Sequence, residues 1–320
     1  MGSVGRHDTV PSSVSGKFSE GTSWLGLTTS SYKYSLQDNY DVLGLTGQGG
    51  FGNVFLAQHR GTCMPVAMKE LMKTEEQVAC IMTEVAILKD VRHSKITQLL
   101  EVIQTKDKVH LVLEYVMGLN LGQEIFQTER QRLQEKDVQR IFRDILGAVH
   151  YRHQQCIVHG DLKPENVLID TQGRAKVCDF GFGFWFLPGQ KVTAPGGTPG
   201  YFASERILYE MYEGPPLDIW ALGVILHEMI NRTRLFCGEP SKVTENIIYE
   251  MVSYPDFFSM DTKNFIGNLR NRDPSMRPTA QKVLEHQWLQ GVRPPSPPEP
   301  LPVPTKRAIL SIWLGWISTH

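Results

Sequence analysis

The pattern of apolar and polar positions changes character once along the chain. Between residues 40 and 116, short apolar runs such as NVFLA, PVAMKEL and VHLVLEYV are separated by turns and predict β-strands, while one stretch near 75–90 has helical spacing. Beyond this part the helical period dominates, and segment 217–230 (LDIWALGVILHEMI) is apolar on nearly every face, as in a buried helix. The pattern predicts a small β-rich lobe over 40–116 and a larger helical lobe over 117–288.

The two ends of the chain differ from this central part. Residues 1–36 are rich in Ser, Thr and Gly and predict a flexible leader. Residues 294–304 (PPSPPEPLPVP) cannot continue a helix, so we expect a Pro-rich tail over 292–320. The tail closes on an apolar stretch that is too short to span a membrane. Segment 294–304 is a candidate site for a partner that recognises polyproline.

Composition narrows the class of protein. The 33 Lys and Arg residues balance 34 Asp and Glu residues, which argues against a protein that binds nucleic acid by neutralising many phosphates. The five cysteines are widely spread, without a Cys-x-x-Cys pair, so we expect reduced thiols and a cytoplasmic location. The N-terminus lacks the apolar run of a signal peptide, and Arg6 stands where a myristoylation signal needs Ser or Thr.

A glycine-rich turn joins two of the predicted strands. Residues 47–54 (GQGGFGNV) contain a Gly-x-Gly-x-x-Gly pattern. In a dinucleotide-binding fold these glycines would precede a helix, whereas here the chain runs directly into another strand. Backbone N–H groups of such a turn can approach phosphates closely because glycine has no Cβ. By itself, the segment fits an ordinary hairpin equally well.

The next strand and helix carry a lysine and a glutamate that can meet. Strand alternation puts Ala67 and Lys69 on one face. Glu84 lies beside the apolar stripe of the following helix and can therefore point inward. An inward glutamate needs a cation, and Lys69 is the obvious candidate; the alternative is a solvent-facing lysine on an edge strand.

The most specific pattern is His159-Gly160-Asp161-Leu162-Lys163-Pro164-Glu165-Asn166, followed by Asp179-Phe180-Gly181. Phosphoryl transfer requires positioning and charge neutralisation more than covalent chemistry. Asp161 can accept a proton from an attacking hydroxyl, and Lys163 can stabilise the transferring group. Asn166 and Asp179 are hard oxygen ligands suited to Mg²⁺.

Taken together, residues 40–288 resemble a eukaryotic serine/threonine protein kinase domain. The resemblance extends to the Asp218-Ile219-Trp220 helix and to Arg277, which matches the arginine that pairs with Glu205 in this family. Residues 103–109 and 188–191 are most similar to the sperm motility kinase branch of the AMP-activated-kinase relatives. The implied fold is α+β and two-lobed, with a small antiparallel β-sheet and one key helix in the first lobe and a mostly helical second lobe.

The resemblance also implies the reaction and its residues. It implies ATP and Mg²⁺ as cofactors, proteins with Ser or Thr acceptors as substrates, Asp161 and Lys163 as catalytic residues, and Asn166 and Asp179 as metal ligands. A further implication is a preference for basic residues upstream of the target, through Glu165. Leu113 would be the gatekeeper, and Leu88, Leu100, His159 and Phe180 would stack as a spine. The implied nucleotide-binding residues are Thr46, Gly47, Gln48, Gly49, Gly50, Phe51, Gly52, Asn53, Val54, Ala67, Lys69, Glu84, Glu114, Val116 and Leu168.

The sequence departs from the family pattern near the catalytic loop. Gly160 replaces an arginine that, in related kinases, pairs with a phosphate on the activation loop, and Ala194 at the usual acceptor position has no hydroxyl. We expect a kinase that does not depend on activation-loop phosphorylation. Ser204 replaces the usual proline before Glu205. These departures keep open a second hypothesis, a pseudokinase that binds nucleotide or partners without catalysis. We expect Cys178, next to Asp179, to be a buried and unreactive thiol.

Overall fold

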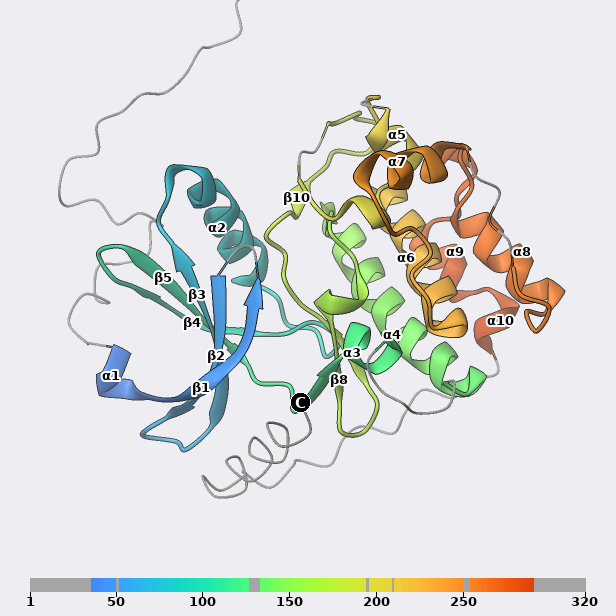
Figure 1. Cartoon of the computed structure of the whole chain (residues 1–320). Helices are drawn as coiled ribbons and strands as arrows, with labels where there is room; N and C mark the ends of the chain where they lie inside the picture. Colours follow the sequence, from blue (N-terminus) through green and yellow to red (C-terminus); the bar gives the residue numbers. More distant parts are fainter. Residues whose placement is uncertain are drawn as a thin grey trace, which may run out of the picture.

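The structure is a computed structural model that describes residues 36–49, 52–126, 133–193, 196–208, 210–249, 252 and 254–290. Gly50, Phe51, Ala194, the leader up to residue 35 and the Pro-rich tail all lie outside these ranges. A β-sheet with one long helix lies on one side of the molecule and a mostly helical lobe on the other (Figure 1). The predicted two-lobed α+β fold is confirmed.

The first lobe is built on a five-stranded antiparallel sheet with the order β1-β2-β3-β5-β4. The predicted runs NVFLA and PVAMKEL fall within β2 and β3, whereas VHLVLEYV extends two residues beyond the end of β5 at Glu114. The elements of this lobe are α1 (Leu36–Asn39), β1 (Tyr40–Gly49), β2 (Gly52–His59), β3 (Pro65–Met72), α2 (Glu75–Leu88), β4 (Leu99–Gln104) and β5 (Lys108–Glu114).

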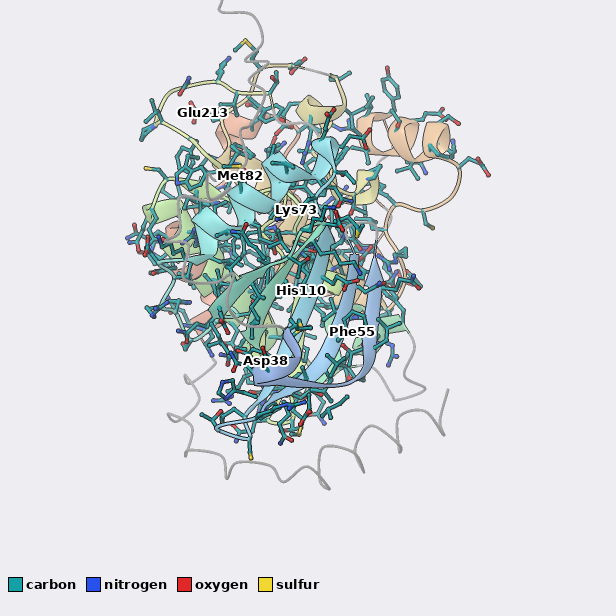
Figure 2. The ribbon with its side chains drawn as sticks, turned by 90° about the vertical axis from the view of Figure 1, so that its left-hand side faces the viewer. Asp38, Phe55, Lys73, Met82, His110 and Glu213 are labelled. Carbon is teal, nitrogen blue, oxygen red and sulfur yellow. The ribbon has the colours of Figure 1, made fainter. Side chains whose placement is uncertain are left out.

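The two faces of the sheet differ in what they contact. Val66 and Met68 of β3 belong to a small apolar cluster on the outer face, together with Val112 of β5. Figure 2 looks onto this side of the molecule and labels Phe55 and His110 on its strands. Because side chains alternate along a strand, Ala67 and Lys69 face the opposite way, toward the second lobe.

Helix α2 covers the inner side and begins at an N-cap, where the Thr74 side chain accepts a hydrogen bond from the N–H of Gln77. Ile81, Val85 and Leu88 of the predicted inward stripe are buried, whereas Val78 is only partly so. Glu84 is buried with the stripe, at 2% exposure, although it is charged.

The prediction that Leu100 stacks in the buried spine is wrong. Leu100 is 51% exposed, whereas its neighbour Leu99 is 8% exposed and belongs to the main apolar core with Leu88 and Phe180. The cause is a register shift between β4 and β5, where Leu99 pairs with Leu113 but Glu101 already pairs with Val112. Leu100 is the extra residue of this bulge, and a bulge reverses the alternation expected for a regular strand.

The different burial of Leu99 and Leu100 predicts different effects of their substitution on stability. We expect Leu99→Ala to cost about 2–5 kcal/mol of unfolding free energy because it leaves a cavity in the core. The matched variant Leu100→Ala should change stability by less than about 0.5 kcal/mol. Urea unfolding of both variants measures the difference, and equal losses would contradict the assignment of the bulge.

The second lobe packs around α6, whose residues from Leu217 to Met229 are all buried. The α6 helix is capped by Arg232, the residue after its end, which takes a left-handed backbone conformation with φ of 60°. Two small sheets, β6-β8-β9 and β10-β7, lie at the boundary between the lobes and carry the loops of the site. The elements of this lobe are β6 (Gly118–Asn120), α3 (Leu121–Phe126), α4 (Glu135–Gln154), β7 (Ile157–Val158), the 3₁₀ turn η2 (Pro164–Asn166), β8 (Val167–Asp170), β9 (Ala175–Val177), β10 (Phe184–Trp185), η3 (Pro199–Tyr201), α5 (Ser204–Ile207), α6 (Pro215–Asn231), α7 (Pro240–Tyr249), α8 (Met260–Leu269), η4 (Pro274–Met276), α9 (Ala280–Leu284) and α10 (Gln287–Gln290).

In the part of the chain that the structure describes, none of the helices combines the length and apolar character needed to cross a bilayer.

Candidate active site

Lys69 of β3 forms a buried ion pair with Glu84 of α2. The Lys69 Nζ lies 2.9 Å from Oε1 and 2.8 Å from Oε2 of Glu84, and 3.0 Å from Oδ1 of Asp179. Burial by itself lowers the pKa of Lys69, but attraction to the two carboxylates outweighs burial and raises it. The lysine is therefore a permanent cation that links the sheet, α2 and the segment after β9.

Asp179 is held in an unusual backbone conformation, with φ of 61°. Burial tends to raise the pKa of Asp179, but attraction to Lys69 outweighs it and keeps the pKa below its ordinary value. The next residue, Phe180, lies against His159 with ring centroids 4.6 Å apart. Asp179 thus stays ionised at neutral pH. Its position is held by the contact with Lys69 and by the packing of the adjacent Phe180 against His159.

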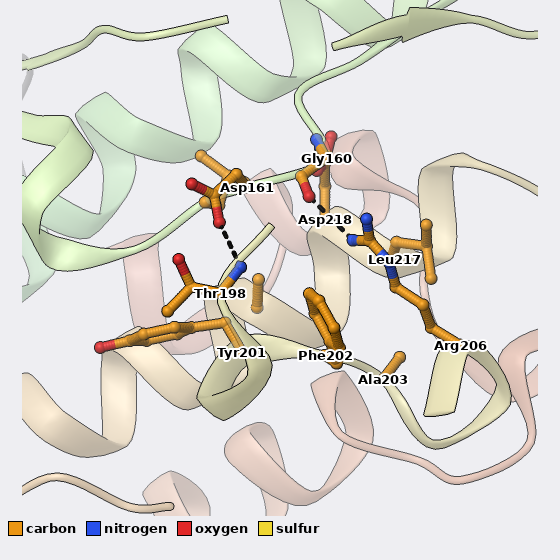
Figure 3. A pocket seen from close by; sticks show the side chains of 11 residues that line it. Gly160, Asp161, Thr198, Tyr201, Phe202, Ala203, Arg206, Leu217 and Asp218 are labelled. Atoms are coloured by element: carbon orange, nitrogen blue, oxygen red, sulfur yellow. Dashed lines mark hydrogen bonds between the residues drawn. The ribbon is translucent and has the colours of Figure 1, made fainter. Parts of the chain in front are cut away.

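Residues 159–166, which match the catalytic loop of the resembled family, bring Asp161, Lys163 and Asn166 together. Lys163 Nζ lies 2.9 Å from Asp161 Oδ2, and the amide nitrogen of Asn166 donates to the Asp161 carbonyl at 2.9 Å. Thr198, from a distant segment, donates its N–H to Asp161 Oδ1 at 2.7 Å (Figure 3). The Thr198 hydroxyl also accepts a hydrogen bond from Lys163 at 2.8 Å. No local sequence pattern marks Thr198 as a contact of the candidate base.

Asp218 of α6 binds the backbone of the same loop. Its carboxylate accepts hydrogen bonds from the backbone N–H groups of His159 at 2.9 Å and Gly160 at 3.1 Å. Burial tends to raise the pKa of Asp218, but hydrogen bonding and attraction to His153 lower it overall. Gly160 has φ of 76°, and a Cβ there would lie 2.5 Å from the Phe182 carbonyl oxygen. This backbone therefore excludes a side chain at position 160 without local rearrangement.

Strand register gathers the candidate nucleotide-binding residues of the first lobe. Val54 pairs with Lys69, and Ala67 pairs with Leu113, so the four side chains share the inner face. On either side of the glycine-rich turn, β1 ends at Gly49 and β2 begins at Gly52. A Cβ on Gly52 would lie 1.9 Å from the Glu70 carbonyl oxygen.

The remaining candidates of this set lie around that face. Thr46, Gln48 and Gly49 are exposed at the end of β1, and Gly47 is partly exposed. Asn53, the second residue of β2, pairs with Gln48. Glu114 closes β5, and its side chain binds Lys176 at 2.6 Å rather than pointing freely into the site. Val116 follows in the connection between the lobes, and Leu168 lies on β8.

The side chains at the second lobe fit a magnesium ion that is shared with phosphates. Among the described residues, no group of three or more His, Cys, Asp or Glu side chains is arranged to hold a metal. Mg²⁺ commonly takes only one or two protein oxygens and completes its shell with water and phosphate. Lys69 and the Gly181 N–H both bind Oδ1 of Asp179, which leaves Oδ2 for a cation. The amide nitrogen of Asn166 is used by Asp161, which leaves its side-chain oxygen.

Two further ion pairs involve segments that are remote in sequence. Arg277 binds Glu205 through two hydrogen bonds, at 2.6 and 2.8 Å, so the structure forms the pair implied by the family resemblance. Glu165 accepts a hydrogen bond from Arg234, whose guanidinium also lies 4.3 Å from the centre of the Phe126 ring. No local pattern marks Arg234 as a partner of Glu165, and our sequence analysis did not find it.

Cys178 is expected to resist alkylation. Burial, and next the Asp179 carboxylate, raise the pKa of its thiol to about 12. At pH 8 only about one molecule in ten thousand would carry the reactive thiolate. We expect iodoacetamide to label the exposed Cys63 and Cys237 of the native protein first, as measured by peptide mass spectrometry. Labelling of Cys178 at the rate found for the denatured chain would contradict this expectation.

The arrangement matches that of known proteins. A family model described as the protein kinase domain matches residues 40–289. Mouse sperm motility kinase 2B is 36% identical over 282 residues, covering 87% of this chain and 58% of that protein. Mouse sperm motility kinases 2A and 3A are each 36% identical, covering 85% and 86% of this chain and 54% and 55% of those proteins. The chain thus spans little more than half the length of these curated relatives. By the domain match and the similarity over most of its length, the chain belongs to the protein kinase family.

Proposed function

We propose that this chain transfers the γ-phosphoryl group of ATP to serine or threonine hydroxyls of protein substrates. The observation that carries the proposal is the convergence of two charged clusters at one boundary between lobes. Lys69, Glu84 and Asp179 form one cluster, and Asp161, Lys163 and Asn166 form the other. Together the two clusters supply the cations, the candidate base and the oxygen ligands that phosphoryl transfer requires.

The proposed roles follow from the charges and contacts of these side chains. Asp161 takes the proton of the attacking hydroxyl while the hydroxyl oxygen bonds to the γ-phosphorus and ADP leaves. Lys163, beside Asp161, offsets the negative charge of the transferring group. Lys69, held by Glu84, binds the α- and β-phosphates. Mg²⁺, when bound by Asn166 and Asp179, supplies further neutralisation of phosphate charge.

We also propose that activity does not require phosphorylation of the activation segment. Ala194 has no hydroxyl and Gly160 has no side chain with which to bind a phosphate. The Thr198–Asp161 contact is nevertheless formed in the unmodified chain, which supports the proposal. Treating the purified protein with phosphatase should leave its turnover unchanged, and a large drop would refute this part of the proposal.

The decisive experiment measures Mg-ATP affinity alongside transfer of radiolabelled phosphate to peptides that differ only in a serine, threonine or tyrosine acceptor. We expect binding with transfer to serine and threonine. Binding without transfer would instead support a pseudokinase, the reading favoured by Gly160 and Ser204. Because Glu165 is bound by Arg234, the peptides should be compared with and without an upstream arginine.

Two broader proposals rest on the sequence. The five cysteines are all free, which supports a cytoplasmic location. Segment 294–304 is proposed to bind a polyproline-recognising partner, and deletion of residues 292–320 would test it by loss of that partner with turnover retained.

A further inference from the structure

Arg206 makes an unusual set of contacts beside the candidate base. It is the third residue of α5 and directly follows Glu205. Its guanidinium donates to the carbonyl oxygen of Gly160 at 2.8 Å and to the carbonyl oxygen of Gly196, and it stacks on the Phe202 ring at 4.3 Å. Figure 3 shows the side chain reaching from α5 to Gly160 across a small pocket. One side chain therefore bridges the catalytic loop and the activation segment, the part of the chain between Asp179 and Glu205.

This cation is held without a carboxylate in contact. Within the described ranges, no carboxylate lies within ion-pair distance of Arg206. Burial lowers the pKa of its guanidinium, although Tyr212, and next Asp161 and Asp218, act to raise it. Removing a guanidinium from water is costly unless its donors are satisfied. Here backbone carbonyls of two different loops satisfy them, so the contact fixes those loops relative to each other.

The backbone around the guanidinium is built to allow this approach. Gly160, Gly196 and Gly197 have φ of 76°, 84° and 99°, conformations that favour glycine. A Cβ on Gly197 would lie 3.2 Å from the Gly160 carbonyl oxygen and 3.4 Å from Arg206 Nη2. A Cβ on Gly196 would lie 2.1 Å from the Phe182 ring. A side chain at Gly197 would press on the Gly160 carbonyl, whereas side chains at Gly160 and Gly196 would collide with Phe182.

Both anchored carbonyls lie close to the reacting groups in the chain. Gly160 directly precedes Asp161, and Gly196 lies two residues before Thr198, which binds both Asp161 and Lys163. We propose that Arg206 is a positioning residue that locks the segment 196–203 onto the catalytic loop and so holds Thr198 against Asp161 without a phosphate. This inference deepens the proposed kinase function and rests on it. Related kinases have an arginine at the position of Gly160. Here Arg206 of α5 supplies a positive charge instead, and backbone carbonyls accept its hydrogen bonds.

The test compares Arg206→Leu and Arg206→Lys with wild type and with Arg60→Leu, which removes an exposed arginine paired with Asp41 in the first lobe. We expect Arg206→Leu to lower kcat roughly ten- to hundred-fold, because small misplacements of a reacting group are costly. The KM for ATP and the Mg-ATP affinity should change less than about two-fold, since the Lys69 cluster is untouched. Arg206→Lys should recover part of kcat, because an ammonium keeps the charge but lacks the planar fork. Arg60→Leu should match wild type.

A second readout does not depend on turnover. Trypsin cleavage after the exposed Lys191, just before the locked segment, should be faster in Arg206→Leu than in wild type or Arg60→Leu. Unchanged kcat or unchanged cleavage in Arg206→Leu would overturn the proposal. So would loss of folding by both Arg206 variants in thermal melts, which would make Arg206 a general stability residue. If wild type transfers no phosphate at all, the proposed function fails, while the cleavage rates still decide whether the lock exists.

Discussion

Asp161→Asn is expected to lower the turnover number by about 10²- to 10⁴-fold, the range typical for loss of a general base. Asparagine has the same shape and can still accept the Thr198 N–H through its side-chain oxygen, which lies 2.7 Å away in the native chain. It cannot accept the hydroxyl proton, and it loses the 2.9 Å ion pair with Lys163. The measurement is transfer of radiolabelled phosphate to a generic basic peptide.

Nucleotide binding should survive this change. Lys69 and Glu84 lie on the first lobe, and Lys69 keeps its contacts with Glu84 and Asp179, so we expect the Mg-ATP dissociation constant of Asp161→Asn to stay within about two-fold of wild type. Asp137→Asn, which breaks an exposed pair with Arg140, is the matched control and should be fully active. Equal turnover in Asp161→Asn and wild type would remove Asp161 from the reaction and favour the pseudokinase.

Arg277→Met is expected to give the largest loss of stability, about 3–5 kcal/mol. The Arg277 side chain is 0% exposed and Glu205 is 3% exposed, so the variant leaves a carboxylate buried without its cation. It also removes the donors to the carbonyl oxygens of Asn271 and Pro216. For a domain of this size the melting temperature should fall by on the order of 10 °C.

Two controls separate the charge effect from the loss of packing. Adding Glu205→Gln to Arg277→Met should recover part of the loss, because it removes the uncompensated charge. Arg60→Met breaks an exposed pair and should cost less than about 1 kcal/mol. A cost for Arg277→Met no greater than that for Arg60→Met would show that the buried pair does not contribute to stability.

Much of the fold followed from short-range pattern. Strand alternation placed Ala67 and Lys69 on one face, and continuous apolarity identified the buried helix α6. These features depend on neighbouring residues, so they are readable without the tertiary structure. Motif spacing likewise singled out Lys69, Asp161 and Asp179, because a shared chemistry needs those residue types together. The inward orientation of Glu84 followed from its place beside an apolar stripe.

The tertiary structure decided where remote segments meet. Leu99 rather than Leu100 enters the core because β4 bulges against β5, and a bulge arises from the pairing of two strands. The hydrogen-bond acceptors of Arg206 and Arg234 lie 10 to 69 residues away in the chain. A long, flexible side chain reaches whatever acceptor the folded backbone brings near, and no local period encodes that acceptor. The sequence alone therefore determined the family, the sheet and the charged residues of the site, whereas the contacts that hold those residues in place depended on chain folding over long distances.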